Sequence, residues 1–274
     1  MDDNEYTYVK RKVNELLCID LDNYKERQMR RRINSFLDRA NADDVGSYFN
    51  SMEKDQKMIQ DLKDFLTINV SEFFRDDRQF EKLESVIMPE LLRDRVCLKL
   101  WSAGCSIGAE PYTMAIILEE LSPGTNHKII ATDLDETILK QARAGGPYME
   151  QDVRNVRPQR LAKYFRKEGD KYWVVDSIRN RVHFKQHNLL GDPYEDNCDL
   201  ILCRNVVIYF TDNAKSKINR GFHASLREGG VLFIGGSEII FDSSKIGLCV
   251  IIPSFYRKLP AGTNVKSGSI RTDI

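Results

Sequence analysis

The chain has 274 residues, 42% hydrophobic and 30% charged, and its 41 basic and 41 acidic side chains give a net charge of zero. At about 150 residues per domain, this length predicts two structural units, or one large α/β domain with an appendage. The apolar content excludes a disordered chain, and the neutral charge argues against general nucleic-acid binding. No apolar stretch approaches the roughly 20 residues that span a bilayer, and the first residues lack the apolar core of a signal peptide. We therefore expect a cytoplasmic protein with no direct membrane insertion.

The cysteines and histidines do not have the spacing of a metal site. None of the six cysteines forms a CxxC pair, so we expect reduced and mostly buried thiols. His183 and His187 lie in RVHFKQHNLL, whose alternation is that of a strand and would separate the two side chains. We therefore expect no metal.

Residues 1–68 are predicted to form a helical domain. Within YKERQMRRRINSFLDRA, helical spacing places four apolar side chains in one stripe, namely Met29, Ile33, Phe36 and Leu37. The same segment carries six basic side chains against two acidic ones. The basic residues are Lys25, Arg27, Arg30, Arg31, Arg32 and Arg39. Two interpretations stay open: a solvated helix face, or a docking surface for an acidic partner.

From about residue 97 to 260, strands and helices alternate. Strands are expected at 97–103, 128–133, 199–205 and 229–238, with a last strand or hairpin at 248–259. Helices are expected between them, including an amphipathic one that follows the glycines of 104–108, and others at 134–146 and 211–226. This alternation predicts a Rossmann-like α/β domain, a parallel sheet with helices on both faces, within residues 69–260. The alternation of strands and helices is interrupted at DKYWVVDSIRNRVHFKQH. This segment predicts short antiparallel strands in a small inserted β-subdomain within about 146–187. Residues 261–274 are expected to be a flexible tail.

Ligands of such sheets lie beyond the carboxyl ends of the strands, where the strand order reverses. The first predicted strand ends in Gly104-Cys105-Ser106-Ile107-Gly108, a turn that lets the backbone approach a ligand closely. Asp133 ends the next strand, about where an acidic residue binds ribose hydroxyls, whereas Asp135 is better placed to cap the following helix. Glu110 at the helix start would repel a pyrophosphate but suits a ribose or a cationic ligand. The pattern favours S-adenosylmethionine over a dinucleotide.

Five motifs then carry a resemblance to a known family. LKLWSAGCSIGAEPYTMA, ATDLDETILKQARAG, HNLL, LILCRNVVIYF and INVSEFFRD resemble, in the family's order, the CheR family of chemotaxis receptor methyltransferases. The resemblance implies a monomeric protein-glutamate O-methyltransferase of chemotaxis signal transduction, with an all-helical N-terminal domain and a small β-subdomain. It would transfer a methyl group from S-adenosylmethionine to glutamates on the cytoplasmic helical domain of chemoreceptors, leaving glutamate methyl esters and S-adenosylhomocysteine.

The resemblance also implies roles for individual residues. The candidate cofactor contacts are Asn69, Ser71, Arg75, Glu110, Asp133, Asn188, Leu189, Arg204 and Asn205. Asn69, Ser71 and Arg75 match the segment that lies across the cofactor. Glu110 and Asp133 match the acids that contact the cofactor. Asn188 and Leu189 match the adenine site, and Arg204 and Asn205 match the strand end nearest the sulfonium. Arg75 would pair with the methionyl carboxylate or orient the incoming glutamate. A receptor surface rich in glutamate would call for a basic surface opposite it, so charge complementarity makes Lys25, Arg27, Arg30 and Arg31 the candidate receptor-binding residues.

The chain departs from the family at two positions. Ala109 replaces the first of two adjacent acids, and Gly235-Gly236-Ser237-Glu238 lacks a histidine that is common in that stretch. We therefore give that stretch no catalytic role. No general base is expected either, because a glutamate carboxylate is already ionised at neutral pH, and no catalytic residue is assigned. Arg75 and Tyr209 are candidates only, and Tyr209 is interpreted equally well as a packed core residue. A non-catalytic S-adenosylmethionine-binding or scaffolding homologue remains an alternative, as does a nicotinamide oxidoreductase.

Overall fold

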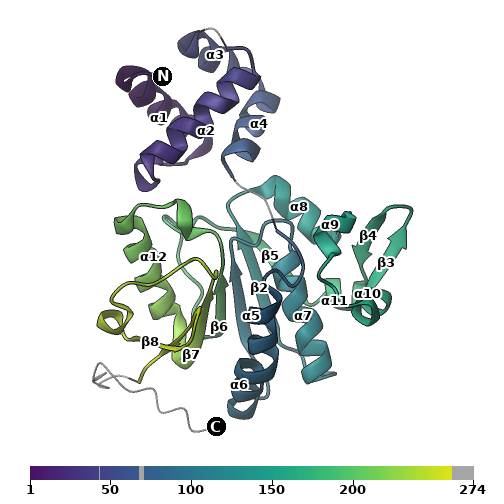
Figure 1. Ribbon diagram of the computed structural model, residues 1–274. Helices are drawn as coiled ribbons and strands as arrows, with labels where there is room; N and C mark the ends of the chain where they lie inside the picture. The colour runs from purple at the N-terminus through teal and green to yellow at the C-terminus, as the bar shows by residue number, and fades with distance from the viewer. Residues whose placement is uncertain (43, 68–70, 261–274) are drawn as a thin grey trace. The chain divides into compact units, whose positions relative to one another are not determined.

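A computed structural model describes residues 1–42, 44–67 and 71–260, and its residues fall into two compact units (Figure 1). The first unit comprises residues 1–69 with 208–217, and the second comprises residues 70–207 with 218–274. The predicted tail at 261–274 lies outside the described residues.

The first unit is helical, as its sequence predicts. Its elements are α1 (Asp3–Leu17), the 3-10 turn η1 (Leu21–Asn23), α2 (Glu26–Arg39), α3 (Val45–Met52) and α4 (Gln56–Leu66). Aspartates start three of these helices, because each side chain accepts hydrogen bonds from backbone N–H groups of the first turn: Asp2, Asp44 and Asp55. The Glu5 side chain in turn accepts the N–H of Asp2, which completes a capping box on α1. Local chemistry thus fixes where these helices begin.

The predicted apolar stripe of α2 is confirmed, since Met29, Ile33, Phe36 and Leu37 are all buried. Phe36 packs against Phe65 of α4, with ring centroids 5.3 Å apart. This unit also contains the segment around Phe210, whose ring lies 4.6 Å from that of Tyr24. Phe210 also forms an isolated antiparallel β-bridge with Tyr24, which precedes α2.

A seven-stranded sheet forms the second unit, in the order β5-β2-β1-β6-β7-β9-β8. The strands are β1 (Lys99–Ala103), β2 (Lys128–Asp133), β5 (Val182–Gln186), β6 (Cys198–Cys203), β7 (Leu226–Ile234), β8 (Leu248–Ile252) and β9 (Phe255–Lys258). From β5 to β7 all neighbours are parallel, whereas β9 runs antiparallel to β7 and β8. The predicted Rossmann-like fold is confirmed as a mixed sheet with an antiparallel hairpin at one edge.

Helices connect the strands of this sheet. Before β1 come α5 (Asp77–Lys82), the π-helical turn η2 (Leu83–Ile87) and α6 (Met88–Asp94), followed in chain order by α7 (Ala109–Leu121), α8 (Glu136–Ala144), α9 (Glu150–Val153), α10 (Pro158–Tyr164), α11 (Asp176–Arg179), η3 (Val207–Tyr209), α12 (Asp212–Ser225) and η4 (Ser243–Ile246). The expectation of an amphipathic helix after the glycine turn is wrong. The first three turns of α7 are buried almost completely, because this helix lies inside the domain core rather than at its surface.

The predicted inserted β-subdomain is smaller than its sequence pattern indicates. Only β3 (Phe165–Glu168) and β4 (Lys171–Val174) form an antiparallel pair. The expectation of an antiparallel strand at the end of this region is wrong, because β5 joins the main sheet parallel to β2. This pairing makes β5 an edge strand of the main sheet, and its Phe184 packs on Tyr112 of α7 with ring centroids 5.5 Å apart.

Candidate functional site

The order of the strands reverses between β1 and β6. From β1 the chain proceeds to β2 and β5 on one side, and only then to β6 and β7 on the other. Because these strands are parallel, their carboxyl ends meet along one side of the sheet, which we call the carboxyl edge. Ligands of open α/β sheets bind at this switch point, so the carboxyl edge is the candidate site.

The glycine turn after β1 lies at the carboxyl edge. Gly104 and Gly108 have φ values of 81° and 86°, which favour glycine, and the N–H groups of Gly104 and Cys105 donate to the carbonyl oxygen of Thr132. A Cβ on Gly104 would lie 2.4 Å from Cγ2 of Val206. The turn therefore needs a glycine at this position to fit between β2 and the segment after β6.

Asp133 at the end of β2 organises this turn. Its Oδ2 accepts the N–H of Ser106 at 2.8 Å, and its Oδ1 accepts the N–H of Asp135 at 3.0 Å. Burial raises the pKa of the Asp133 carboxyl, and the two N–H groups oppose that shift by favouring the ionised form. Asp135 caps α8 by accepting the N–H of Thr137, as predicted. Asp133 thus supplies a carboxylate whose backbone contacts hold it in place beside the glycine turn.

Arg204, directly after β6, is a buried cation within the site. Its side chain is 3% exposed and pairs with Asp76 at 2.6 Å and with Glu110 at 3.6 Å. The guanidinium carbon lies 5.0 Å from the ring centroid of Phe80 and 4.7 Å from that of Phe233. The two carboxylates and the aromatic faces compensate a charge that would otherwise be costly to bury.

Glu110 extends this set of charges to α7. Its Oε1 accepts the hydroxyl of Ser102 at 2.7 Å, and its Oε2 faces Arg204. Burial raises the pKa of the Glu110 carboxyl, and the neighbouring guanidinium partly offsets the shift. Ser102, which sequence reasoning did not single out, anchors the predicted acid from inside the sheet.

Residues 71–76, which we call the strap, precede α5. Predicted residues Ser71 and Arg75 lie on the strap, and Asn69 lies outside the described residues. The N–H of Phe74 donates to Oγ1 of Thr113 at 3.2 Å, and Arg204 donates to the carbonyl oxygen of Arg75 at 2.8 Å. The strap is therefore fastened both to α7 and to the end of β6.

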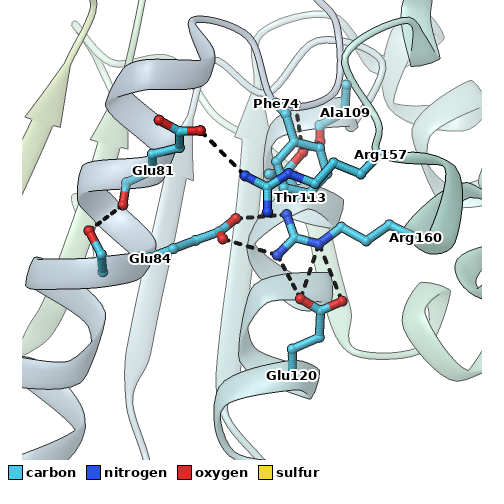
Figure 2. A network of polar contacts seen from close by, with 9 residues as sticks. Phe74, Glu81, Glu84, Ala109, Thr113, Glu120, Arg157 and Arg160 are labelled. Atoms are coloured by element: carbon cyan, nitrogen blue, oxygen red, sulfur yellow. Dashed lines mark hydrogen bonds and ion pairs between the residues drawn. The ribbon is translucent and has the colours of Figure 1, made fainter.

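A polar network beside the strap involves three helical segments (Figure 2). Arg160 of α10 donates to Glu84 of η2 at 2.8 and 3.0 Å, and its shortest bond to Glu120 of α7 is 2.6 Å. The guanidinium carbon also lies 4.7 Å from the ring centroid of Phe74. Arg160 thus ties the inserted region to the strap and to the helix that follows the glycine turn.

The loop after β5 carries the predicted adenine-site residues. The N–H of His187 donates to the carbonyl oxygen of Asp133 at 2.9 Å, which places this loop against the end of β2. The side chain of Asn188 accepts the N–H of Leu190, and the carbonyl oxygen of Leu189 accepts the hydroxyl of Tyr194. Asn188 and Leu189 therefore lie in a hydrogen-bonded loop that adjoins Asp133.

Among the described residues, the polar atoms that the site leaves buried without a partner include Oγ of Ser106, Nε of Arg204, Oδ1 of Asn205 and Oε1 of Glu238. Buried polar atoms are nearly always hydrogen-bonded, so unpartnered ones at a carboxyl edge point to a ligand. Ser106 and Asn205 also have positive φ values, of 50° and 59°, as strained residues at functional sites often do. Hydroxyl, guanidinium and amide groups beside a glycine turn and carboxylates fit the ribose and amino-acid parts of S-adenosylmethionine.

The predicted receptor-binding residues lie in the first unit. Arg27 and Arg31 are exposed one turn apart on α2. Arg30, in contrast, pairs with Asp3 at 2.6 Å and with Glu26 at 2.8 Å. These ion pairs give Arg30 a structural role, so it is not fully available to a partner. Lys25 precedes α2, and its N–H donates to the carbonyl oxygen of Tyr209 at 2.9 Å.

Sequence reasoning missed three side chains that support Arg204 and Asn205: Asp76, Gln79 and Glu238. Asp76 falls within a quoted motif, but nothing in the sequence pairs it with an arginine 128 residues later. Among the described residues, all six cysteines are free, no group of three acidic, histidine or cysteine side chains could hold a metal, and no helix is long and apolar enough to cross a membrane.

Comparisons with known proteins agree with this geometry. Residues 69–250 match the family described as CheR methyltransferase, SAM binding domain, and residues 4–67 match the CheR methyltransferase all-alpha domain. A chemotaxis protein methyltransferase of Listeria innocua is 42% identical over 258 residues, 93% of this chain and 98% of that protein. One from Borreliella burgdorferi is 32% identical, over 88% of this chain and 89% of that protein. Chemotaxis protein methyltransferase 1 of Pseudomonas aeruginosa is 34% identical, over 76% and 80%. The chain therefore belongs to the CheR methyltransferase family and is an S-adenosylmethionine-dependent methyltransferase of chemotaxis.

Proposed function

We propose that the chain methylates glutamate side chains on the cytoplasmic helical domain of chemoreceptors, forming glutamate methyl esters. The observation that carries this proposal is a carboxyl edge that combines a glycine turn, Asp133 and the buried Arg204–Glu110 pair. S-adenosylmethionine, when bound, supplies a methyl group on a positively charged sulfonium. A glutamate carboxylate has a reference pKa of about 4.3, so it is ionised at neutral pH and needs no base to activate it.

The chain's own residues would then act by alignment. Glu110 and Asp133 place carboxylates at the ends of β1 and β2, where they suit ribose hydroxyls and a cationic ligand. Arg75, on the strap, is the candidate to pair with a carboxylate of the cofactor or of the substrate. Because opposite charges disappear as the methyl group is transferred, exclusion of water and correct orientation are sufficient sources of catalysis.

The receptor would dock on the first unit. The methylated region of a chemoreceptor is rich in glutamate, so the opposing surface should be basic. We assign this role to Lys25, Arg27 and Arg31. Arg30 contributes less, because it already forms ion pairs with Asp3 and Glu26. The proposed division of labour is receptor recognition by residues 1–68 and methyl transfer by residues 69–260, in a cytoplasmic monomer.

Replacement of Arg27 and Arg31 by alanine tests the docking surface. Exposed charge pairs are worth about 0.2–1 kcal/mol each, so we expect a KM for receptor raised about threefold to tenfold at low salt, with unchanged cofactor affinity. A variant with alanine at Lys54 and Lys57, two exposed lysines of the same unit, serves as the charge-matched control. Equal effects of the two variants would show that only net charge matters.

Methyl transfer itself is tested with labelled S-adenosylmethionine and cytoplasmic receptor fragments from the same organism. We expect label that is released as methanol by mild base, as methyl esters require. Binding of S-adenosylmethionine without transfer to any fragment would instead support the non-catalytic alternative. A parallel titration with NADH, for which we expect no binding, tests the oxidoreductase alternative.

A further inference from the structure

The loop after β7 contains a buried acid with no role in the mechanism derived above. Glu238 is 8% exposed, and its Oε2 accepts the N–H of Gly235 at 2.7 Å and the N–H of Asn205 at 3.0 Å. Gly235 directly follows β7, and Asn205 lies two residues after β6. A single carboxylate oxygen therefore joins two neighbouring strand ends at the carboxyl edge.

The backbone on both sides of this carboxylate is adapted to it. Asn205 has a φ of 59°, a left-handed conformation that an L residue adopts only at a cost of about 1 kcal/mol. A Cβ on Gly235 would lie 2.7 Å from Oε2 of Glu238 and 3.1 Å from the nitrogen of Asn205. Only glycine at position 235 lets the carboxylate reach the Asn205 N–H, and that hydrogen bond supports the strained conformation.

Support of this kind is unnecessary for pairing the strands themselves. The parallel register of β6 and β7 already includes Cys203 opposite Ile234, the residues immediately before the two loops. Burial raises the pKa of the Glu238 carboxyl, which means that the fold disfavours its charge. A buried acid that adds little to the sheet is explained better by what it holds beyond the strand ends.

The groups that Glu238 holds are those with unfilled hydrogen-bonding capacity. Oδ1 of Asn205 and Nε of the adjacent Arg204 are both buried without a partner. Their position depends on the backbone of residues 204 and 205, which Glu238 fixes through the Asn205 N–H. We propose that Glu238 is a positioning residue for S-adenosylmethionine: through Oε2 it fixes the backbone that aims Arg204 and Asn205 at the cofactor.

Calorimetric titration of the full chain with S-adenosylhomocysteine tests this proposal without requiring any receptor. We expect Glu238→Ala to weaken binding at least about tenfold, measured well below its unfolding midpoint. Glu238→Gln should stay within about threefold of the unchanged protein, because the amide oxygen can accept both N–H groups. Glu90→Ala is the control, because it removes another carboxylate of the same unit. The partner of Glu90 is Arg257, which lies opposite Val231 within β7 and not at the carboxyl edge.

Two results would overturn the proposal. One is that Glu238→Ala binds S-adenosylhomocysteine within about threefold of the unchanged protein, or loses no more affinity than Glu90→Ala does. The other applies even if the alanine variant does not fold. Glu238→Asp keeps the charge but is one methylene shorter and cannot reach both N–H groups, so it must bind more weakly than Glu238→Gln. The reverse order would mean that charge, and not the two backbone contacts, is what matters.

Discussion

Replacing Arg160 with methionine breaks the network that ties the inserted region to the strap. The Arg160 side chain is 12% exposed, and its partners Glu84 and Glu120 are 20% and 30% exposed. Exposed pairs contribute about 0.2–1 kcal/mol, whereas removing one partner of a buried pair costs about 3–5 kcal/mol. This intermediate burial places the expected loss near 2 kcal/mol, or a fall of about 4–8 °C in Tm for a domain of this size.

The matched control is Arg157→Met, at the residue that immediately precedes the same helix. Arg157 pairs with Glu81 at 3.4 Å, and both side chains are about 60% exposed, so we expect a loss below about 0.5 kcal/mol. Thermal unfolding followed by circular dichroism measures both variants. Because Arg160 also packs on Phe74 of the strap, its variant should bind S-adenosylhomocysteine more weakly than the control. Equal Tm values for the two variants would refute the reasoning.

Three further predictions concern single residues. Gly104→Ala, which forces a Cβ against Val206 at a φ of 81°, should lower the free energy of unfolding by about 1–3 kcal/mol in urea titrations, and an unchanged midpoint would contradict the steric argument. Burial lowers the pKa of His127, whose Nδ1 accepts the N–H of Leu98, so its contribution is present above about pH 6.5 and lost as the pH falls. His127→Gln should therefore flatten the decline in stability between about pH 7 and 5, and an identical slope would exclude this histidine as the cause. Tyr209→Phe should keep kcat within about threefold, because the substrate carboxylate needs no base, and a loss of about a hundredfold or more would show that the hydroxyl takes part.

Much of the fold follows from local patterns in the sequence. The buried stripe of α2 comes directly from helical spacing, and the cap of α8 comes from Asp135 at the start of a helical segment. The glycine turn was equally visible, because Gly104 and Gly108 have the positive φ values that glycine allows. Features set by neighbours within a few residues were therefore predictable.

Features set by distant neighbours were not. The direction of β5 depends on its pairing with β2. Ile129 of β2 lies opposite Val182 of β5, which is 53 residues later in the chain, and an alternating pattern does not specify which strand will be the partner. Arg30 looked like part of a free basic face until the fold brought Asp3 against it. Glu238 gave no periodic signal at all, since its role depends on a backbone N–H of Asn205 at the end of another strand.

The central claim is that a methyl group reaches a glutamate side chain, and tandem mass spectrometry of a treated receptor fragment tests it most directly. After incubation with S-adenosylmethionine, the account predicts one added methyl mass on glutamates of the cytoplasmic helical domain, abolished by excess S-adenosylhomocysteine and removed by mild base. A methyl group found on lysine, arginine or the main chain, or one that survives base, would contradict it.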